Sequence, residues 1–456
     1  MIAPARTAAF RALLSVEAGQ IDLGEATARA RAALGDARDR ALLSEIVTGT
    51  LRARGAIDFQ LARTAGRPLA KLDPEVLIAL RMGLYQLLYL ERVPASAVVN
   101  DAVALVRKAG KSSAAGFVNG ILRRLARERA TLPWPARPDD GDAPASRADA
   151  VAYLSISGSH PVWLVERWLD RHGFTATEAW VRFNNTPSPL CLRVNTAQAT
   201  REAVAASLAA LGIRTRPARW APHGLIVEDD QPAMPVPTGT SPYFIQDEAS
   251  QLVPELLQAG GAARVLDACA APGGKAVAIA SGLGPGGMVV AADVRPRRVA
   301  LVAATLRAAG VPARVVHTAA DGGWPWLPRF THVLVDAPCS GLGTVRRDPD
   351  IRWRRQPDDL DRFAAVQDRL LIQAARAVMP GGRIVYSTCS SEPEENDAVV
   401  DRFLLSHPGF RRLRVQDLPG LPAEVAALAD PAGYLRTDPA RHGLEAFFGA
   451  VFTAPD

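Results

Sequence analysis

The spacing of apolar residues predicts helices in the first part of the chain. In PEVLIALRMGLYQLLYLERV, the residues Leu77, Leu80, Leu84 and Leu87 fall on one helical face. The segment AAGFVNGILRRLARERA repeats this spacing, and no alternating strand pattern interrupts it. We therefore predict an all-α bundle for residues 1–130.

Two further segments follow before the pattern changes again. Residues 131–150, TLPWPARPDDGDAPASRADA, hold four prolines and four aspartates, a composition typical of a linker. In residues 151–240, helical HPVWLVERWLDRHG and TATEAWVRFNN precede strand-like PLCLRVNT and GLIVED. This order predicts a small α+β module.

Short apolar runs separated by helical stretches dominate residues 241–456. These runs are ARVLDAC, GMVVAADV, ARVVHTAAD, THVLVDAPC, GRIVYSTC and EAFFGAVF. Buried runs of this kind predict a mostly parallel sheet in a doubly wound α/β domain. Ligands of such domains bind beyond the carboxyl ends of the strands.

Composition narrows the class of protein. A chain of 456 residues with 48% hydrophobic and 22% charged residues is expected to fold into two or three domains. Its four cysteines lack disulfide or zinc spacing, so we expect a reducing compartment and no metal. We find no signal-peptide pattern, and the longest uncharged run, 276–292, is broken by glycines. We expect a cytoplasmic protein.

Charge is concentrated in the predicted bundle. Residues 1–130 carry 20 Lys and Arg against 12 Asp and Glu, a net +8, whereas the remainder of the chain sums to −2. A basic domain joined to a near-neutral one suggests a polyanion held by the first and processed by the second. Solvated arginines that merely decorate helix surfaces would give the same balance.

The loop DACAAPGGKA follows the first strand of the predicted sheet. Gly273 and Gly274 permit close backbone approach to a ligand, but the loop is neither a P-loop nor GxGxxG. Asp267, Asp293 and Asp321 end the first three strands. Acids in register without a phosphate loop suit adenosine attached to an uncharged or cationic group, as in S-adenosylmethionine. The alternative is that these acids only cap helices or form turns.

Two cysteines lie at the ends of later strands. Cys339 occurs in VLVDAPCSGLG and Cys389 in RIVYSTCSSEPEEN, each flanked by turn-forming or polar residues. Cys191 and Cys269 are more typical of packing positions. Spacing alone allows either Cys339 or Cys389 to be a nucleophile.

The motifs DACAAPGGK, DAPCSGLGTVRRDPDIRW and YSTCSSEPEEN, in this order, resemble those of the RNA cytosine-C5 methyltransferases. VPASAVVNDAVALVRKAG with GFVNGILRRL resembles the NusB-like helical domain of one branch, RsmB (Sun, Fmu). The resemblance implies a NusB-like RNA-binding domain, a small RRM-like module and a Rossmann-like methyltransferase domain. It also implies methylation of cytosine 967 of 16S ribosomal RNA, before full subunit assembly, by a protein that we expect to be a monomer.

The resemblance assigns roles to residues of this chain. Cys389 would attack carbon 6 of cytosine, Cys339 would assist product release, and Asp336 would bond to the base. The residues implied to contact or shape the site of S-adenosylmethionine are Cys269, Ala270, Ala271, Pro272, Gly273, Gly274, Lys275, Asp293, Asp321 and Asp336. The chain departs from the family pattern at Ala276, often threonine, and at Glu445-Ala446, usually Asp-Gly.

The segment TVRRDPDIRWRR follows the Cys339 motif and combines arginines with a tryptophan. Arginines suit phosphates and an aromatic ring suits base stacking, so the segment is a candidate RNA contact. Its residues are Arg346, Arg347, Arg352, Trp353, Arg354 and Arg355. The alternative is that the tryptophan packs on its own domain.

Three other functions stay open from the sequence. The substrate could be a tRNA or another ribosomal cytosine, because only the N-terminal bundle favours the small-subunit branch. A non-catalytic RNA-binding factor would have no use for Cys339, Cys389 or the glycine loop. Transfer to an amino nitrogen is disfavoured because DAPC lacks the aromatic residue of the usual Asp/Asn-Pro-Pro-aromatic motif.

Overall fold

The computed structural model describes residues 2–139, 146–228, 234, 239–319 and 323–456. Internal contacts divide the chain into two compact units. The helical unit comprises Met1–Thr186 and Val345–Arg354, and the sheet unit comprises Pro187–Thr344 and Arg355–Asp456. The predicted boundary between residues 150 and 151 does not coincide with this division, because the helices up to residue 184 belong to the helical unit.

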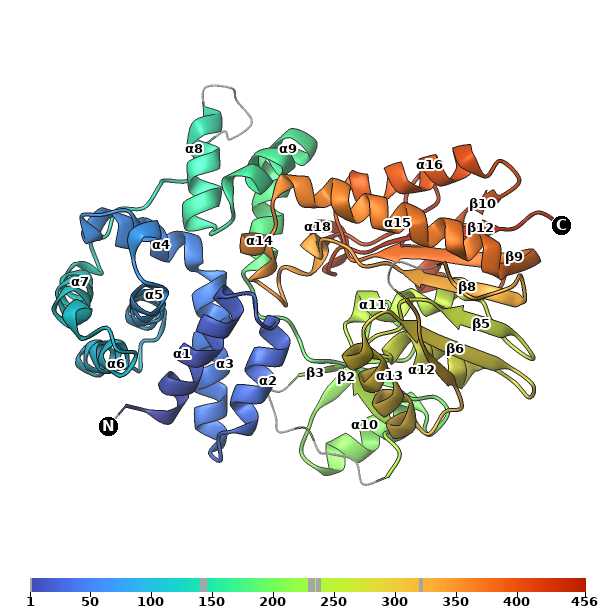
Figure 1. Cartoon of the computed structure of the whole chain (residues 1–456), viewed down its shortest axis with the longest axis horizontal. Helices are drawn as coiled ribbons and strands as arrows, with labels where there is room; N and C mark the ends of the chain where they lie inside the picture. The colour runs from blue at the N-terminus through green and yellow to red at the C-terminus, as the bar shows by residue number, and fades with distance from the viewer. Residues whose placement is uncertain (1, 140–145, 229–233, 235–238, 320–322) are drawn as a thin grey trace. The chain divides into compact units, whose positions relative to one another are not determined.

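The first part of the helical unit is a bundle packed around α5 (Figure 1). Its helices are α1 (Pro4–Glu17), α2 (Leu23–Ala32), α3 (Ala37–Arg52), α4 (Arg54–Ala65), α5 (Pro74–Tyr89), α6 (Ala95–Lys108) and α7 (Ala115–Glu128). Of the predicted stripe on α5, Leu80, Leu84 and Leu87 are buried and Leu77 is half-buried. Ile78, Ala79 and Met82 on its other faces are buried too. A helix buried on nearly all sides forms the centre of a bundle.

The rest of the helical unit is formed by α8 (Arg147–Ala152), a π-helical turn (Tyr153–Ser157), α9 (Val162–Asn184) and α14 (Ile351–Arg354). Helix α8 begins inside the predicted linker, so the linker ends earlier than residue 150; residues 140–145 lie outside the described part. Gly173, with φ 72°, kinks α9 and separates the two helical segments expected from the sequence.

The sheet unit begins with a small four-stranded sheet in the order β2-β3-β1-β4. Its strands are β1 (Cys191–Val194), β2 (Thr215–Pro217), β3 (Gly224–Val227) and β4 (Tyr243–Ile245), and all pairs are antiparallel. Helix α10 (Arg201–Ala210) covers it through Val204 and Leu208, which share a core with Leu192. The sequence predicts a small α+β module at residues 151–240. This sheet and α10 form its strand-containing part, whereas α9 lies in the helical unit and β4 lies beyond residue 240.

The main sheet has the strand order β10-β12-β9-β8-β5-β6-β7, with β11 beside β12. Its strands are β5 (Arg264–Asp267), β6 (Met288–Asp293), β7 (Arg314–His317), β8 (Phe330–Asp336), β9 (Val378–Thr388), β10 (Arg411–Leu413), β11 (Leu435–Arg436) and β12 (Phe448–Thr453). The strands from β5 to β9 pair in parallel, whereas β12 runs antiparallel to β9. The strand order reverses between β5 and β8, and ligands of open α/β sheets bind at such a reversal.

Helices cover both faces of the main sheet (Figure 1). On one face, α12 (Gly274–Gly282) and α13 (Pro296–Ala309) share a core with Val265 and Leu334. On the other face, α15 (Pro357–Ala377) and α16 (Asp397–Ser406) share a core with Leu266 and Val333. Because successive strand residues point to opposite faces, both must be apolar, which explains the continuous apolar runs. Short helices α11 (Glu248–Leu252), α17 (Ala423–Ala426) and α18 (Pro439–His442) complete the unit.

The helices of the described residues do not meet the requirements of a membrane span. Among them, no helix combines the length and the apolar character that a bilayer span requires.

Candidate active site

The glycine-containing loop lies where β5 meets α12, at the reversal of the strand order. Gly273 has φ +110°, and a Cβ there would stand 3.0 Å from the Cβ of Thr305. Gly274 opens α12 directly after it. Glycine is therefore required at 273 by both backbone conformation and space, which leaves the backbone of the loop open to a ligand.

Asp267, at the end of β5, is a fully buried carboxylate. Neither of its side-chain oxygens forms a hydrogen bond of acceptable geometry with any described residue. Burial, and then repulsion from Asp336, raises the pKa of Asp267 to about 7. The charge of Lys275 and the backbone of Cys269 only partly offset this rise. A buried carboxylate with so few donors is a costly arrangement that a donor or a cation on a ligand would relieve.

Asp293 ends β6 and is also buried, but it accepts a hydrogen bond from the backbone N–H of Arg295 at 3.1 Å. Its backbone carbonyl accepts the N–H of Thr318, which follows β7. Asp321, the third predicted acid, lies outside the described residues. Two of the three predicted acids therefore lie at the ends of neighbouring strands, β5 and β6.

Asp336, at the end of β8, connects the loop after β5 with β9. Its Oδ2 lies 2.6 Å from the Nζ of Lys275, and its Oδ1 accepts the hydroxyl of Ser387 at 2.8 Å. Burial opposes the charged form of Lys275, yet the Asp336 carboxylate outweighs it and raises the pKa of Lys275. The Asp336 side chain keeps 22% of its surface exposed, so it can also meet a substrate.

The sulfur atoms of Cys339 and Cys389 lie 3.1 Å apart. Cys339 follows β8 and Cys389 follows β9, and the two strands are parallel neighbours. The contact with Cys389 and burial raise the pKa of Cys339 well above its ordinary value. The structure thus brings together the two cysteines that the sequence singled out, and both are partly exposed.

Gly343 joins the Cys339 loop to the chain around Cys389 and Ala446. Its N–H donates to the carbonyl of Cys389, and its own carbonyl accepts the N–H of Ala446, both at 3.0 Å. A Cβ at 343 would lie 2.0 Å from the oxygen of Ala446. The departure at Glu445-Ala446 therefore falls at a backbone support of the cysteine loops, and the side chain of Ala446 is buried.

The other two cysteines differ in their surroundings, because Cys191 is buried whereas Cys269 is half-buried in the loop after β5. Cys191 is buried in the core around α11 and accepts a hydrogen bond from Gln251 at 3.3 Å. Burial, and then the charge of Asp267, raises the pKa of Cys269. A thiol that stays protonated is a poor nucleophile, which agrees with a packing role.

The prediction that Arg352 contacts RNA is wrong for the conformation described. Arg352 is fully buried in the helical unit, and its guanidinium donates to the carbonyl of Ser159 at 2.9 Å and to Asn185 Oδ1 at 3.0 Å. The indole N–H of Trp353 donates to the carbonyl of Leu51 at 2.8 Å. These two side chains hold α14 in place.

The remaining arginines of this segment differ in their surroundings. Arg346 stacks on the ring of Phe183, with its guanidinium carbon 4.4 Å from the ring centroid. Arg355 donates to the carbonyl of Ser340, next to Cys339, at 2.7 Å. Arg354 is exposed and pairs with Asp350 at 3.1 Å, while Arg347 is half-buried.

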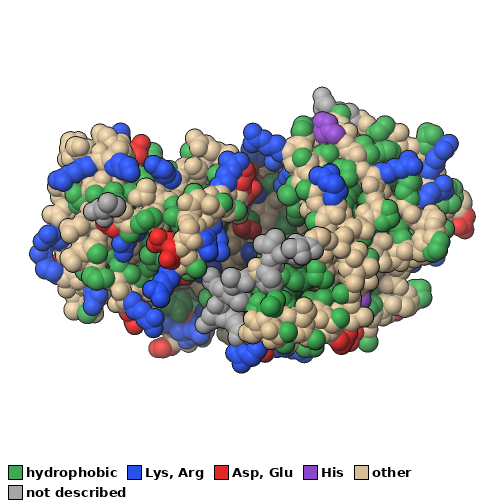
Figure 2. All heavy atoms as spheres, turned by 90° about the horizontal axis from the view of Figure 1, so that it is seen from below, with side chains coloured by type: hydrophobic (Ala, Val, Ile, Leu, Met, Phe, Trp, Pro, Cys, Tyr) green, Lys and Arg blue, Asp and Glu red, His purple; other side chains and the backbone are tan. Residues whose placement is uncertain are grey.

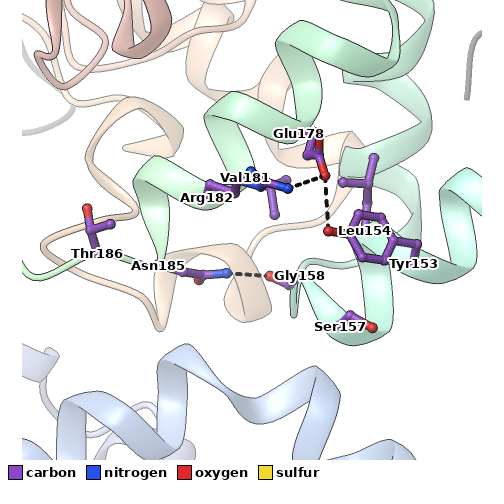
Figure 3. Close-up of a pocket in the computed structure, with 9 residues that line it drawn as sticks. All are labelled: Tyr153, Leu154, Ser157, Gly158, Glu178, Val181, Arg182, Asn185 and Thr186. Carbon is purple, nitrogen blue, oxygen red and sulfur yellow. Dashed lines mark hydrogen bonds and ion pairs between the residues drawn. The ribbon is translucent and has the colours of Figure 1, made fainter. Parts of the chain in front are cut away.

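The helical unit also contains a cavity of about 230 Å³ (Figure 3). It is lined by Tyr153, Leu154, Ser157, Gly158, Glu178, Val181, Arg182, Asn185 and Thr186. Glu178 accepts hydrogen bonds from Tyr153 and Arg182 within the cavity and from Arg137 outside it. The Arg137 bond is the main cause that lowers the pKa of Glu178. These polar groups satisfy one another, so the cavity offers a ligand little chemistry.

On the face drawn in Figure 2, charged side chains give no sharper location for a polyanion. Lys and Arg side chains are scattered over the face drawn in Figure 2, with Asp and Glu side chains between them. Within the residues that the structure covers, no group of three or more His, Cys, Asp or Glu is arranged to hold a metal ion.

Three family models match separate parts of the chain. The model described as 16S rRNA methyltransferase RsmB/F matches residues 254–453. The NusB family model matches residues 3–127, and a ferredoxin-like domain of RsmF/B-like methyltransferases matches residues 160–234. These matches confirm the predicted fold class of a NusB-like bundle, a small α+β module and a methyltransferase domain.

Known proteins are similar over most of the chain. A Bacillus subtilis protein named "Probable ribosomal RNA small subunit methyltransferase B" is 36% identical over 82% of this chain and 81% of its own. The ribosomal RNA small subunit methyltransferase B of Pseudomonas putida is 33% identical over 91% and 92%.

Solved structures agree with this relationship. The crystal structure of PH0851 shares the fold at 24% identity, with a TM-score of 0.82 and 99% of both chains covered. A methyltransferase homolog from Pyrococcus horikoshii has a TM-score of 0.56 at 26% identity, covering 68% of this chain and 99% of its own. Together with the sequence relatives, these findings confirm the resemblance found in the motifs: the chain belongs to the 16S rRNA methyltransferase RsmB/F family.

Proposed function

We propose that the protein methylates carbon 5 of a cytosine in 16S ribosomal RNA through a transient covalent bond between Cys389 and carbon 6. The observation that carries this proposal is the 3.1 Å separation of the Cys339 and Cys389 sulfurs beside Asp336, at the carboxyl ends of β8 and β9. The relatives named for small-subunit ribosomal RNA support the substrate class. The resemblance of the motifs implies cytosine 967.

The residues around the loop after β5 fit S-adenosylmethionine. The Asp267 carboxylate accepts no hydrogen bond of acceptable geometry in the described contacts, and Gly273 leaves room for backbone approach. The nearby acids Asp293 and Asp336 complement a cationic, hydroxylated ligand. When bound, S-adenosylmethionine supplies an electrophilic methyl group. The backbone from Cys269 to Lys275 would shape its site, and Asp293 would accept the ribose hydroxyls.

Cytosine needs activation because its carbon 5 is a weak nucleophile. The Cys389 thiolate adds to carbon 6, which places electron density on carbon 5, where the methyl group is accepted. A base then takes the proton from carbon 5, and the electron pair of that C–H bond re-forms the double bond between carbons 5 and 6. The bond from carbon 6 to sulfur breaks at the same time, which returns the Cys389 thiolate and restores the aromatic ring. Asp336 bonds to the ring nitrogen or amino group and favours the addition.

The state of Cys339 supports this division of roles. Because its pKa is raised, Cys339 keeps its proton and can donate an S–H bond to the Cys389 sulfur. A protonated thiol then stands beside the attacking sulfur, where it can assist product release. The target base must be unstacked to reach these sulfurs.

Labelled S-adenosylmethionine and unmodified 16S ribosomal RNA test the proposal. The wild type should label carbon 5 of one cytosine, Cys389→Ala should abolish labelling, and Cys339→Ala should accumulate RNA bound to protein on denaturing gels. Cys191→Ala, which removes a buried packing thiol, is the matched control. Label on any base other than cytosine, or reversed outcomes for the two cysteines, would refute the proposed chemistry.

A further inference from the structure

A buried carboxylate outside the roles assigned above lies behind both cysteine loops. Glu395, in a 3₁₀ turn (Pro393–Glu395) before α16, is fully buried. Its Oε1 accepts the backbone N–H of Ser340 at 2.7 Å, and its Oε2 accepts the hydroxyls of Ser340 and Ser390, each at 2.5 Å. Ser340 follows Cys339 and Ser390 follows Cys389, so one carboxylate joins the residues next to both sulfurs.

We propose that Glu395 is a positioning residue that fixes the separation of the Cys339 and Cys389 sulfurs by bridging Ser340 and Ser390. This inference rests on the proposed function, because it concerns how the two thiols act together on one base. Glu395 forms no hydrogen bond to either sulfur among the described contacts, so its positioning effect passes through the two serines. Its charge also acts directly on Cys339, as one of the lesser causes that raise the pKa of that thiol.

The surrounding hydrogen bonds require an acceptor at this position. Gln367 Nε2 donates to Glu395 Oε1 at 3.1 Å and to the carbonyl of Pro338, before Cys339, at 3.0 Å. The hydroxyl of Tyr386 donates to the Glu395 carbonyl at 2.5 Å. Four donors therefore converge on the two carboxylate oxygens, which an ionised carboxylate accepts and a carboxamide cannot. Buried networks of this kind are rigid when every member is satisfied.

Rigidity matters here because the reaction uses both sulfurs in sequence. While the base is bonded to Cys389 through carbon 6, the Cys339 thiol must stay close enough to assist its release. The backbone bond from Gly343 to Cys389 fixes one side of the junction, and Glu395 fixes the residues that follow each cysteine. A displacement of about 1 Å at a reacting group lowers rates by about 100-fold.

The test compares Glu395→Gln with Glu394→Gln, which makes the same chemical change one residue earlier in the same turn. Glu395→Gln should lower kcat for cytosine methylation by about 100-fold, with the KM values for RNA and S-adenosylmethionine within about twofold of wild type. In a Cys339→Ala background it should slow the appearance of the covalent RNA adduct. Glu394→Gln should leave these rates unchanged.

A double-mutant cycle with Ser390→Ala separates bridging from simple structural support. Ser390→Ala removes the hydrogen bond to Glu395 on the Cys389 side. In the double variant with Glu395→Gln, kcat should therefore fall little further than in the more damaging single variant. Additive losses, or a Glu395→Gln variant that loses thermal stability but keeps kcat, would overturn the inference.

If Glu395→Gln does not fold, two other variants test the same inference. Glu395→Asp keeps the charge on a shorter side chain, and Ser390→Ala alone should still lower kcat; an unchanged kcat in Ser390→Ala would contradict bridging. The proposed function is judged separately, by whether the wild type labels cytosine and Cys389→Ala does not. A Glu395→Gln variant with full activity would refute the positioning role of Glu395 but not the proposed function.

Discussion

Neutralising Asp267 should stabilise the ligand-free protein in a pH-dependent way. Asp267→Asn replaces the buried carboxylate, whose oxygens have no hydrogen-bond partner in the described contacts, by a neutral group of the same shape. The folded wild type holds the Asp267 proton up to about pH 7, whereas the unfolded chain releases it near 3.8. Stability of the wild type therefore falls as pH rises between these values and stays low above them.

The size of the effect follows from the difference in pKa. The raised pKa of Asp267 lowers the free energy of unfolding of the wild type by about 4 kcal/mol at pH 8 and by about 1.5 kcal/mol at pH 5. Asp267→Asn removes this cost, so the gain in stability should be larger at pH 8 by about 2.5 kcal/mol.

Hydrogen exchange measured on peptides covering β5 and β8 reports the stability of the main sheet without requiring the helical unit to unfold. At pH 8, exchange in Asp267→Asn should be slower than in wild type by about a thousandfold, and at pH 5 by about tenfold. Asp293→Asn is the control, because that carboxylate already accepts the N–H of Arg295 and its loss should bring no protection.

Ligand binding supplies the second half of this test. If the cofactor donates to Asp267, then Asp267→Asn should bind S-adenosylmethionine at least about tenfold more weakly by calorimetry. Equal protection of wild type and variant at pH 8, or a gain that does not change with pH, would refute the reasoning about the buried charge. Unchanged affinity would refute the contact with the cofactor.

Three other substitutions have expected outcomes. Gly343→Ala places a methyl group against the Ala446 carbonyl and should lower stability by about 3 kcal/mol and abolish methyl transfer, whereas Gly120→Ala, in open space, should do neither. Arg352→Ala should lower the thermal stability of the helical unit by about 3 kcal/mol, since it removes buried charged hydrogen bonds. Arg354→Ala removes an ion pair with the buried Asp350, so it should lower that stability by less than Arg352→Ala does. It should also reduce the salt dependence of RNA binding by about one unit of slope, as expected for an exposed phosphate contact. If RNA binding by Arg354→Ala depends on salt as steeply as binding by the wild type does, Arg354 does not contact an RNA phosphate.

Local patterns explain why much of the fold could be predicted. Apolar runs on β5, β6, β8 and β9 are continuous because both faces of the sheet are covered, and helical stripes recur every three to four residues in the bundle. Strand ends in a parallel sheet meet at one edge, so Asp267, Asp293, Asp336, Cys339 and Cys389 could be expected near one another from the sequence.

Partners distant in the chain could not be predicted in the same way. Arg352 and its acceptor Ser159 are 193 positions apart, and an arginine beside a tryptophan has the same local pattern whether it faces RNA or a buried carbonyl. Glu395 and Ser340 are 55 positions apart, and a glutamate in an acidic run gives no sign that it will be fully buried.

The amino-acid sequence by itself determined which residues form strands and helices and which reactive groups follow the strands, because those features depend on neighbours a few positions away. Only the tertiary structure decided which of the charged groups are buried and what they contact. That choice depends on the free energy of removing a charge from water, which is offset only where the fold brings donors and acceptors from distant segments to the same place.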